Sequence, residues 1–132
     1  MYINSDNLSE LYKGEASDAI KYIEVFERSN MSQFSDYGAW ESCSGLEHVK
    51  IPTTFKDMCS FTFSACSNFK VLDLTSFTDP NQELLPEEGN HTFDQSGVKI
   101  YVANETMLEA FKTKWTGYGQ DPDMWSTDPV PN

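Results

Sequence analysis

The sequence predicts an α/β fold, in which a short solenoid carries a small parallel sheet, short helical turns and a C-terminal capping helix. Two segments of the chain resemble each other at a constant offset of 23 residues. Apolar residues alternate within each segment, as they do in half-buried strands, and one amphipathic helix pattern follows them. The 132 residues amount to about one domain, and 14% aromatic residues are too many for a disordered chain.

The two similar segments are Gly38–Ile51 and Phe61–Leu74, which match position by position. Each ends in apolar residues at relative positions 1, 4 and 6, a spacing that sends the last two side chains to one face of a short strand. One such unit cannot cover its own apolar face, so we expect the units to stack into a parallel sheet. The matched pairs are Trp40 with Phe63, Cys43 with Cys66, Leu46 with Phe69, Val49 with Leu72, and Ile51 with Leu74.

Two weaker copies flank this pair, at Ile20–Val25 and at Val98–Val102. The longer spacing before the last copy indicates an insertion at Thr78–Asn90, which is rich in acidic residues and loop formers. The predicted organisation is an N-terminal cap at 1–18, repeats at 19–103 with the acidic insertion at 78–90, a capping helix at 104–119 and an extended acidic tail at 120–132.

Both ends of the chain are predicted to close the stack, because terminal units need a polar outer face. At the C-terminal end, Asn104 or Thr106 can cap a helix whose Leu108, Phe111 and Trp115 share one face. The tail beyond it has Trp125 as its one large anchor in a stretch rich in proline and acid. At the other end, residues 5–12 fit a strand or a helix equally.

The segments Gly-Ala-Trp-Glu-Ser-Cys-Ser-Gly-Leu (38–46) and Phe-Thr-Phe-Ser-Ala-Cys-Ser-Asn-Phe (61–69) resemble the AFxxCxxL core of BspA-like leucine-rich repeats. Ile51-Pro52 is similar to a frequent Ile-Pro of that family, and 100–115 is similar to its terminal cap. The resemblance spans about 19–118 and departs at Thr78–Asn90. It implies a short leucine-rich-repeat solenoid that attaches to proteins or surfaces, as such repeats do in bacterial and protist surface proteins and in phage proteins.

Charge excludes several partners. The chain has 21 acidic and 9 basic residues and a formal net charge of -12, which repels phosphate backbones and anionic lipid. We therefore expect no nucleic acid partner and no membrane insertion, because the longest apolar runs are also too short to span a bilayer. No signal-peptide pattern is evident, which leaves a cell-surface fragment, a cytoplasmic protein and a virion protein open.

No pattern in the sequence predicts an enzyme, a cofactor or a metal. The acidic residues fall mostly in loops and tails, and Cys43 and Cys66 take inward positions as buried reduced thiols, away from a base such as His48 or His91. Asp79–Glu83 spaces oxygen ligands as calcium loops do, but it lacks the glycine and the distant glutamate. A plain acidic loop is the favoured interpretation, and calcium binding by 78–90 stays open.

The outward positions of the predicted strands are the candidate binding surface, because solenoids present extended sheet faces to partners. The sequence predicts a non-enzymatic leucine-rich-repeat binding module for a protein or cell-surface partner. The alternatives are a structural component of a phage virion or surface assembly, with possible homo-oligomers, and an acidic decoy for a basic protein. The outward positions are Lys21, Tyr22, Glu24, Glu47, His48, Lys50, Lys70, Val71, Asp73, Lys99 and, in an uncertain register, Ile100. The predicted partner-binding residues are Tyr22, Glu24, His48, Lys50, Lys70 and Asp73.

Overall fold

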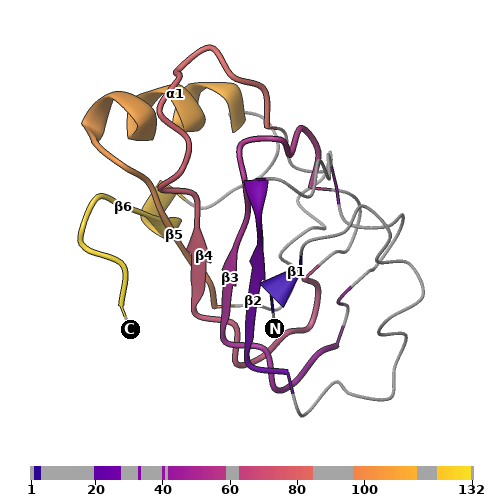
Figure 1. The fold of residues 1–132 in the computed structure, drawn as a ribbon. Helices are drawn as coiled ribbons and strands as arrows, with labels where there is room; N and C mark the ends of the chain where they lie inside the picture. Colours follow the sequence, from indigo (N-terminus) through magenta and orange to yellow (C-terminus); the bar gives the residue numbers. More distant parts are fainter. Residues whose placement is uncertain are drawn as a thin grey trace.

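The computed structural model describes residues 2–3, 20–27, 33, 40, 42–58, 63–84, 97–115 and 122–131. Its strands form one parallel sheet in which each strand pairs with the next one along the chain (Figure 1). A helix, α1, and a short 3-10 turn, η3, separate the last two strands in sequence, so the predicted α/β class is confirmed. The strands are β1 (Tyr2–Ile3), β2 (Tyr22–Val25), β3 (His48–Lys50), β4 (Val71–Asp73), β5 (Lys99–Tyr101) and β6 (Trp125–Ser126); α1 is Glu105–Trp115 and η3 is Pro122–Met124.

One row of apolar side chains crosses the inner face of the sheet and forms the centre of the core. The strand register aligns Ile23 with Val49, Val49 with Leu72, and Leu72 with Ile100, and all four side chains are fully buried. The alignment of Val49 with Leu72 confirms the predicted offset between these two strands. The predicted partners Leu46, Phe69, Ile51 and Leu74 are also buried in this core.

The sequence placed Ile100 among the outward positions, in an uncertain register. In the structure Ile100 lies in the inward row. The lead-in to β5 is one residue shorter than in the matched segments, which left two registers open in the sequence. The structure pairs Lys99 with Val71 and Ile100 with Leu72, so Lys99 faces outward and Ile100 inward. Because strand side chains alternate, a register shifted by one residue would have exposed Ile100 and buried the charge of Lys99.

Two equivalent turns precede β3 and β4. In the first, the amide of Cys43 donates to the carbonyl of Trp40 at 3.1 Å, and in the second, Cys66 donates to Phe63 at 3.2 Å. The residue just before each cysteine has a positive φ, 60° at Ser42 and 58° at Ala65. Non-glycine residues adopt this left-handed conformation at a cost, so the surrounding packing and hydrogen bonds must hold it in place.

The two cysteines of these turns are buried and free, as the sequence predicts. The Cys66 thiol donates to the carbonyl of Trp40 at 3.0 Å and so ties the second turn to the first. Burial raises the pKa of the Cys43 thiol, because desolvation disfavours the thiolate. Cys59, the third cysteine, lies outside the described residues, as do positions 5–12 and most of the predicted N-terminal cap.

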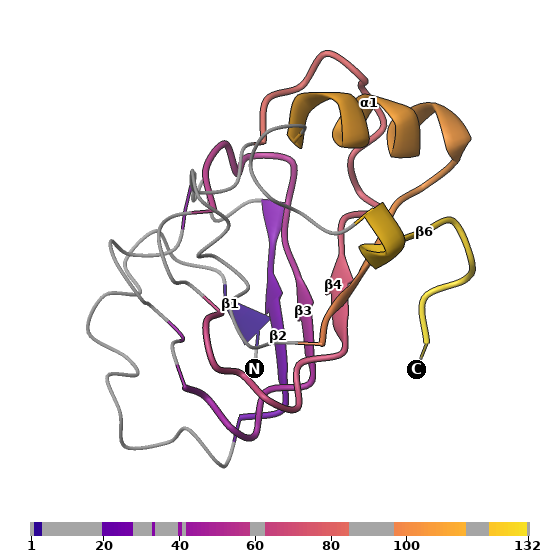
Figure 2. The ribbon, with the colours of Figure 1, turned by 180° about the vertical axis from the view of Figure 1, so that it is seen from behind.

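The helix α1 begins at Glu105, and Asn104 is its N-cap. The Asn104 side-chain oxygen accepts from the amide of Met107 at 3.0 Å, and its carbonyl accepts from Leu108. Figures 1 and 2 both place α1 beyond the C-terminal ends of the central strands. Its buried face packs into the sheet core and carries Met107, Leu108, Phe111 and Trp115.

The described part of the acidic insertion is fastened to this helix. The Lys114 ammonium donates to the carbonyls of Pro80 and Gln82, and the Trp115 indole donates to the carbonyl of Leu84 at 2.7 Å. Phe77, just before the insertion, meets Phe111 edge-on with ring centroids 5.8 Å apart. The segment 80–84 is therefore tied to α1 through its backbone, and Leu84 is buried in the core; 85–90 lie outside the described residues.

The tail after the helix takes a larger part in the fold than the sequence suggests. Residues 125–126 form β6 beside β5, and the Trp125 side chain is only 8% exposed. Its ring stacks on Phe111, with centroids 5.7 Å apart and planes 17° apart, and meets Trp115 at 4.9 Å. Trp125 therefore joins the helix to the sheet instead of ending in a loose peptide.

Replacing Leu72 by alanine tests the inward row. Leu72 is fully buried between Val49 and Ile100, so Leu72→Ala leaves a cavity that the rigid sheet cannot close. We expect the free energy of unfolding to fall by about 2–5 kcal/mol, measured by urea denaturation. The same substitution of the exposed Lys70 should change it by less than about 0.5 kcal/mol.

Trp125→Ala tests whether the tail is part of the cooperative domain. Removing this buried indole from its contacts with Phe111 and Trp115 should cost about 3–5 kcal/mol of unfolding free energy. A chain that ends before Pro129 keeps β6 and should melt as the full chain does. If Trp125→Ala left the melting temperature unchanged, the packing of β6 on α1 would be disproved.

Candidate functional site

The outer face of the sheet, opposite the core, presents two rows of side chains. The strand register places Tyr22, His48, Val71 and Lys99 in the first row, and Glu24, Lys50, Asp73 and Tyr101 in the second. Each row crosses β2, β3, β4 and β5 in order. Five of the six predicted partner-binding residues lie in these rows, and the register brings them together from three strands.

Four of these residues form a half-buried cluster on β2 and β3, which we call the outer-face cluster: Tyr22, Glu24, His48 and Lys50. The Tyr22 hydroxyl donates to Glu24 Oε1 at 2.7 Å. The rings of Tyr22 and His48 lie 4.9 Å apart, tilted by 55°. The first contact joins two residues of β2 and the second joins β2 to β3, so Tyr22 links the polar and aromatic side chains of this surface.

His48 is the titratable centre of the cluster. Its partial burial lowers the pKa of the imidazole, because desolvation disfavours the charged ring. Asp73 and Glu24 oppose this shift by attracting a proton, and Lys50 adds to it by repelling one. The net direction is downward, so the ring tends to be neutral at physiological pH and can both donate and accept a hydrogen bond.

Asp73 is more deeply buried than a contact residue on a free surface, with 6% of its area exposed. Its Oδ1 accepts from the amide of Thr75 at 2.9 Å and from the Thr75 hydroxyl at 2.6 Å. These bonds form the turn that ends β4. Val71 and Tyr101, which flank Asp73, are also buried, so the accessible side chains of the two rows are those of β2 and β3 together with Lys99.

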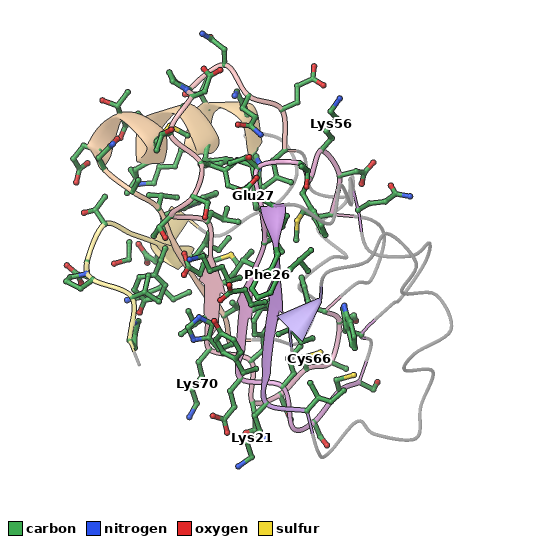
Figure 3. The ribbon with its side chains drawn as sticks, in the orientation of Figure 1. Lys21, Phe26, Glu27, Lys56, Cys66 and Lys70 are labelled. Carbon is green, nitrogen blue, oxygen red and sulfur yellow. The ribbon has the colours of Figure 1, made fainter. Side chains whose placement is uncertain are left out.

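Lys70 lies outside both rows, in the residue that leads into β4. It is exposed, and the backbone bonds of this level connect Lys21 to Glu47, Glu47 to Lys70, and Lys70 to Lys99. Figure 3 shows the Lys21 and Lys70 side chains projecting from the same end of the sheet, where the strands begin. Sequence reasoning selected Lys70 alone, although Lys21 at the same position of its own strand carried the same signal.

Within the described ranges, no three histidine, cysteine, aspartate or glutamate side chains converge as metal ligands would. The only helix found there, α1, is too short and too polar to cross a bilayer. In the acidic segment whose spacing resembles that of calcium loops, the Asp79 carboxylate accepts from the amide of Asn81 at 2.9 Å, which makes a local turn. The outer face remains the best-ordered set of polar side chains from several strands.

Comparison with protein-family models, curated proteins and solved structures finds no match to this chain. The side chains of the outer face are therefore the basis on which a function can be proposed.

The lowered pKa of His48 predicts how stability depends on pH. The unfolded chain binds a proton at this ring near the ordinary value of about 6.5, and the folded chain binds it only at lower pH. The contribution of neutral His48 to the free energy of unfolding is therefore fully present above about pH 6.5. It is lost as the pH falls through the lower pKa that the ring has in the folded chain.

We expect unfolding free energy to fall between pH 8 and pH 5.5, with a smaller fall in His48→Gln, measured by urea denaturation across that range. Proton NMR titration of the wild-type chain should place the His48 midpoint below its value in urea. A midpoint above the unfolded value would mean that Glu24 and Asp73 outweigh desolvation.

Proposed function

We propose that this chain is a non-enzymatic binding module of the leucine-rich-repeat type, which holds a protein partner on the outer face of its sheet. One observation carries the proposal: the outer-face cluster places an aromatic ring, an imidazole, a carboxylate and an ammonium on adjacent positions of β2 and β3, all half-exposed, with the Tyr22 side chain in contact with both Glu24 and His48. Such mixed aromatic and polar surfaces are typical of protein interfaces.

The two equivalent turns support the leucine-rich-repeat part of the proposal. Their hydrogen bonds and their positive φ angles recur at the same offset of 23 residues as the sequence match. Asn68 in the second turn donates through its side chain to the carbonyl of Ser44 in the first, at 2.6 Å. Stacked units that each bond to the previous one are the construction by which repeat proteins build a continuous sheet face.

The chain after β6 favours a binding module over a building block that assembles through its sheet edges. Residues Thr127–Pro131 include Pro129 and Pro131, which have no amide hydrogen to donate to another strand. Both outer strands, β1 and β6, are two residues long. Short edges followed by proline are a common protection against edge-to-edge association.

Light scattering at high concentration should accordingly show a monomer, whereas ordered oligomers would favour the building block.

Site-specific crosslinking tests the proposal. The photoreactive amino acid benzoylphenylalanine, placed at Tyr22, keeps an aromatic ring in the outer-face cluster, and the same group at the exposed Thr113 on α1 is the matched control. In an extract of the source organism we expect Tyr22 to yield a discrete crosslinked protein and Thr113 to yield none. The product should be lost when His48→Ala is added with the melting temperature kept. Identical products from both positions would contradict a partner site on the outer face.

A further inference from the structure

Lysine side chains gather at one end of the sheet in a chain that is otherwise strongly acidic. Of the 9 basic residues in the sequence, Lys21, Lys50, Lys70 and Lys99 lie on or directly before the strands β2, β3, β4 and β5. Three of them, Lys21, Lys70 and Lys99, are exposed at the ends where the strands begin, and we call them the lysine rim. Lys56 projects from the opposite end of the sheet (Figure 3).

The side chains of the lysine rim make no hydrogen bond or ion pair with any residue in the described part of the chain. Lys114 shows the contrast, since its ammonium is occupied by the carbonyls of Pro80 and Gln82. An ammonium in water loses little when it meets a carboxylate of another molecule at such a site. The rim is therefore available for an intermolecular contact.

The acidic side chains of the outer face are mostly occupied within the molecule. Glu24 accepts from the Tyr22 hydroxyl, and Asp73 is buried and accepts twice from Thr75. Only Glu47 lies exposed at the level of the rim, between Lys21 and Lys70 in the backbone ladder. Among the described residues the rim thus has three ammonium groups against one carboxylate, although the whole chain has a net charge of -12.

We propose that the lysine rim binds an acidic segment of the partner protein, a proposal that rests on the function proposed above. Strands lie about 4.8 Å apart, so Lys21 and Lys70, two strands apart, are separated by about 10 Å at their backbones. A peptide in the polyproline II conformation covers this distance in about three residues, and its side chains three residues apart lie on the same side. Carboxylates three residues apart therefore match these two lysines, and a third carboxylate about two residues further along reaches Lys99 on the adjacent strand.

A short acidic segment fits the rim better than a long polyanion does. Charges on the surface act over about 8 Å at physiological ionic strength, so a peptide of a few residues experiences mainly the three lysines. A nucleic acid extends beyond the rim and meets the acidic remainder of the molecule. The neighbouring Tyr22 and His48 rings also offer apolar contact to a side chain of a peptide.

An NMR titration of the 15N-labelled full chain tests the proposal with a synthetic acetylated nonapeptide of glycine and serine that bears three glutamates, the second three residues after the first and the third two residues after the second. We expect amide shifts at residues 21, 70 and 99, and a dissociation constant about tenfold higher in Lys70→Glu. Glu47→Gln should bind more tightly. The same peptide with glutamine in place of glutamate should cause no shifts at the rim.

Lys56→Glu is the matched control for Lys70→Glu, because both change the net charge by the same amount at opposite ends of the sheet. If Lys56→Glu and Lys70→Glu weaken peptide binding equally, binding depends only on net charge and the proposal is overturned. The absence of amide shifts at the rim would also overturn it. Shifts of equal size from a single-stranded oligodeoxynucleotide at the same concentration would make the rim a general anion surface and overturn the peptide assignment. If Lys70→Glu lowers the melting temperature, Lys70→Gln replaces it.

Crosslinking separates failure of the rim from failure of the proposed function. If position 22 captures a partner and Lys70→Glu does not change this capture, the proposed outer-face module is retained and the acidic segment as its ligand is overturned. Loss of any capture at position 22, with peptide binding at the rim retained, would instead overturn the proposed module.

Discussion

The parallel register of the inward row is the constraint on which the rest of the structure depends. Because Ile23, Val49, Leu72 and Ile100 are aligned on adjacent strands, each side chain fills the space beside the next one. Side chains alternate along a strand, so this alignment also fixes which residues face outward. The positions of Tyr22 beside His48 and of Glu24 beside Lys50 follow directly from the packing on the other face of the sheet.

The sequence was sufficient where both copies of a pattern were clear. The match of Val49 to Leu72 and the N-cap region of α1 were predictable because apolar spacing and capping residues act locally. The register of β5 was open, since its lead-in is one residue shorter and Lys99 or Ile100 could each face outward. The role of Trp125 was hidden, because a two-residue strand has no periodicity and its contacts with Phe111 and Trp115 are formed only in the folded chain.

The candidate site was predictable in outline and less so in accessibility. Alternation alone placed Tyr22, Glu24, His48 and Lys50 on the outer face. It could not show that Asp73 is buried by its neighbours and committed to Thr75, because burial on an outward face depends on the size of side chains on adjacent strands. Alternation also could not show that Lys70 is exposed, because its exposure follows from its position just before β4.

The left-handed backbone at Ser42 and Ala65 limits which residue types can replace these two residues in evolution. Glycine, asparagine and aspartate tolerate a φ near 60°, whereas β-branched residues are excluded there by their own side chains. The residue before each cysteine can therefore change while the turn is kept, so no single residue type marks this position in the sequence. Homologous turns in divergent sequences are accordingly better located by the buried cysteine position and the strand that follows than by the residue that carries the strain.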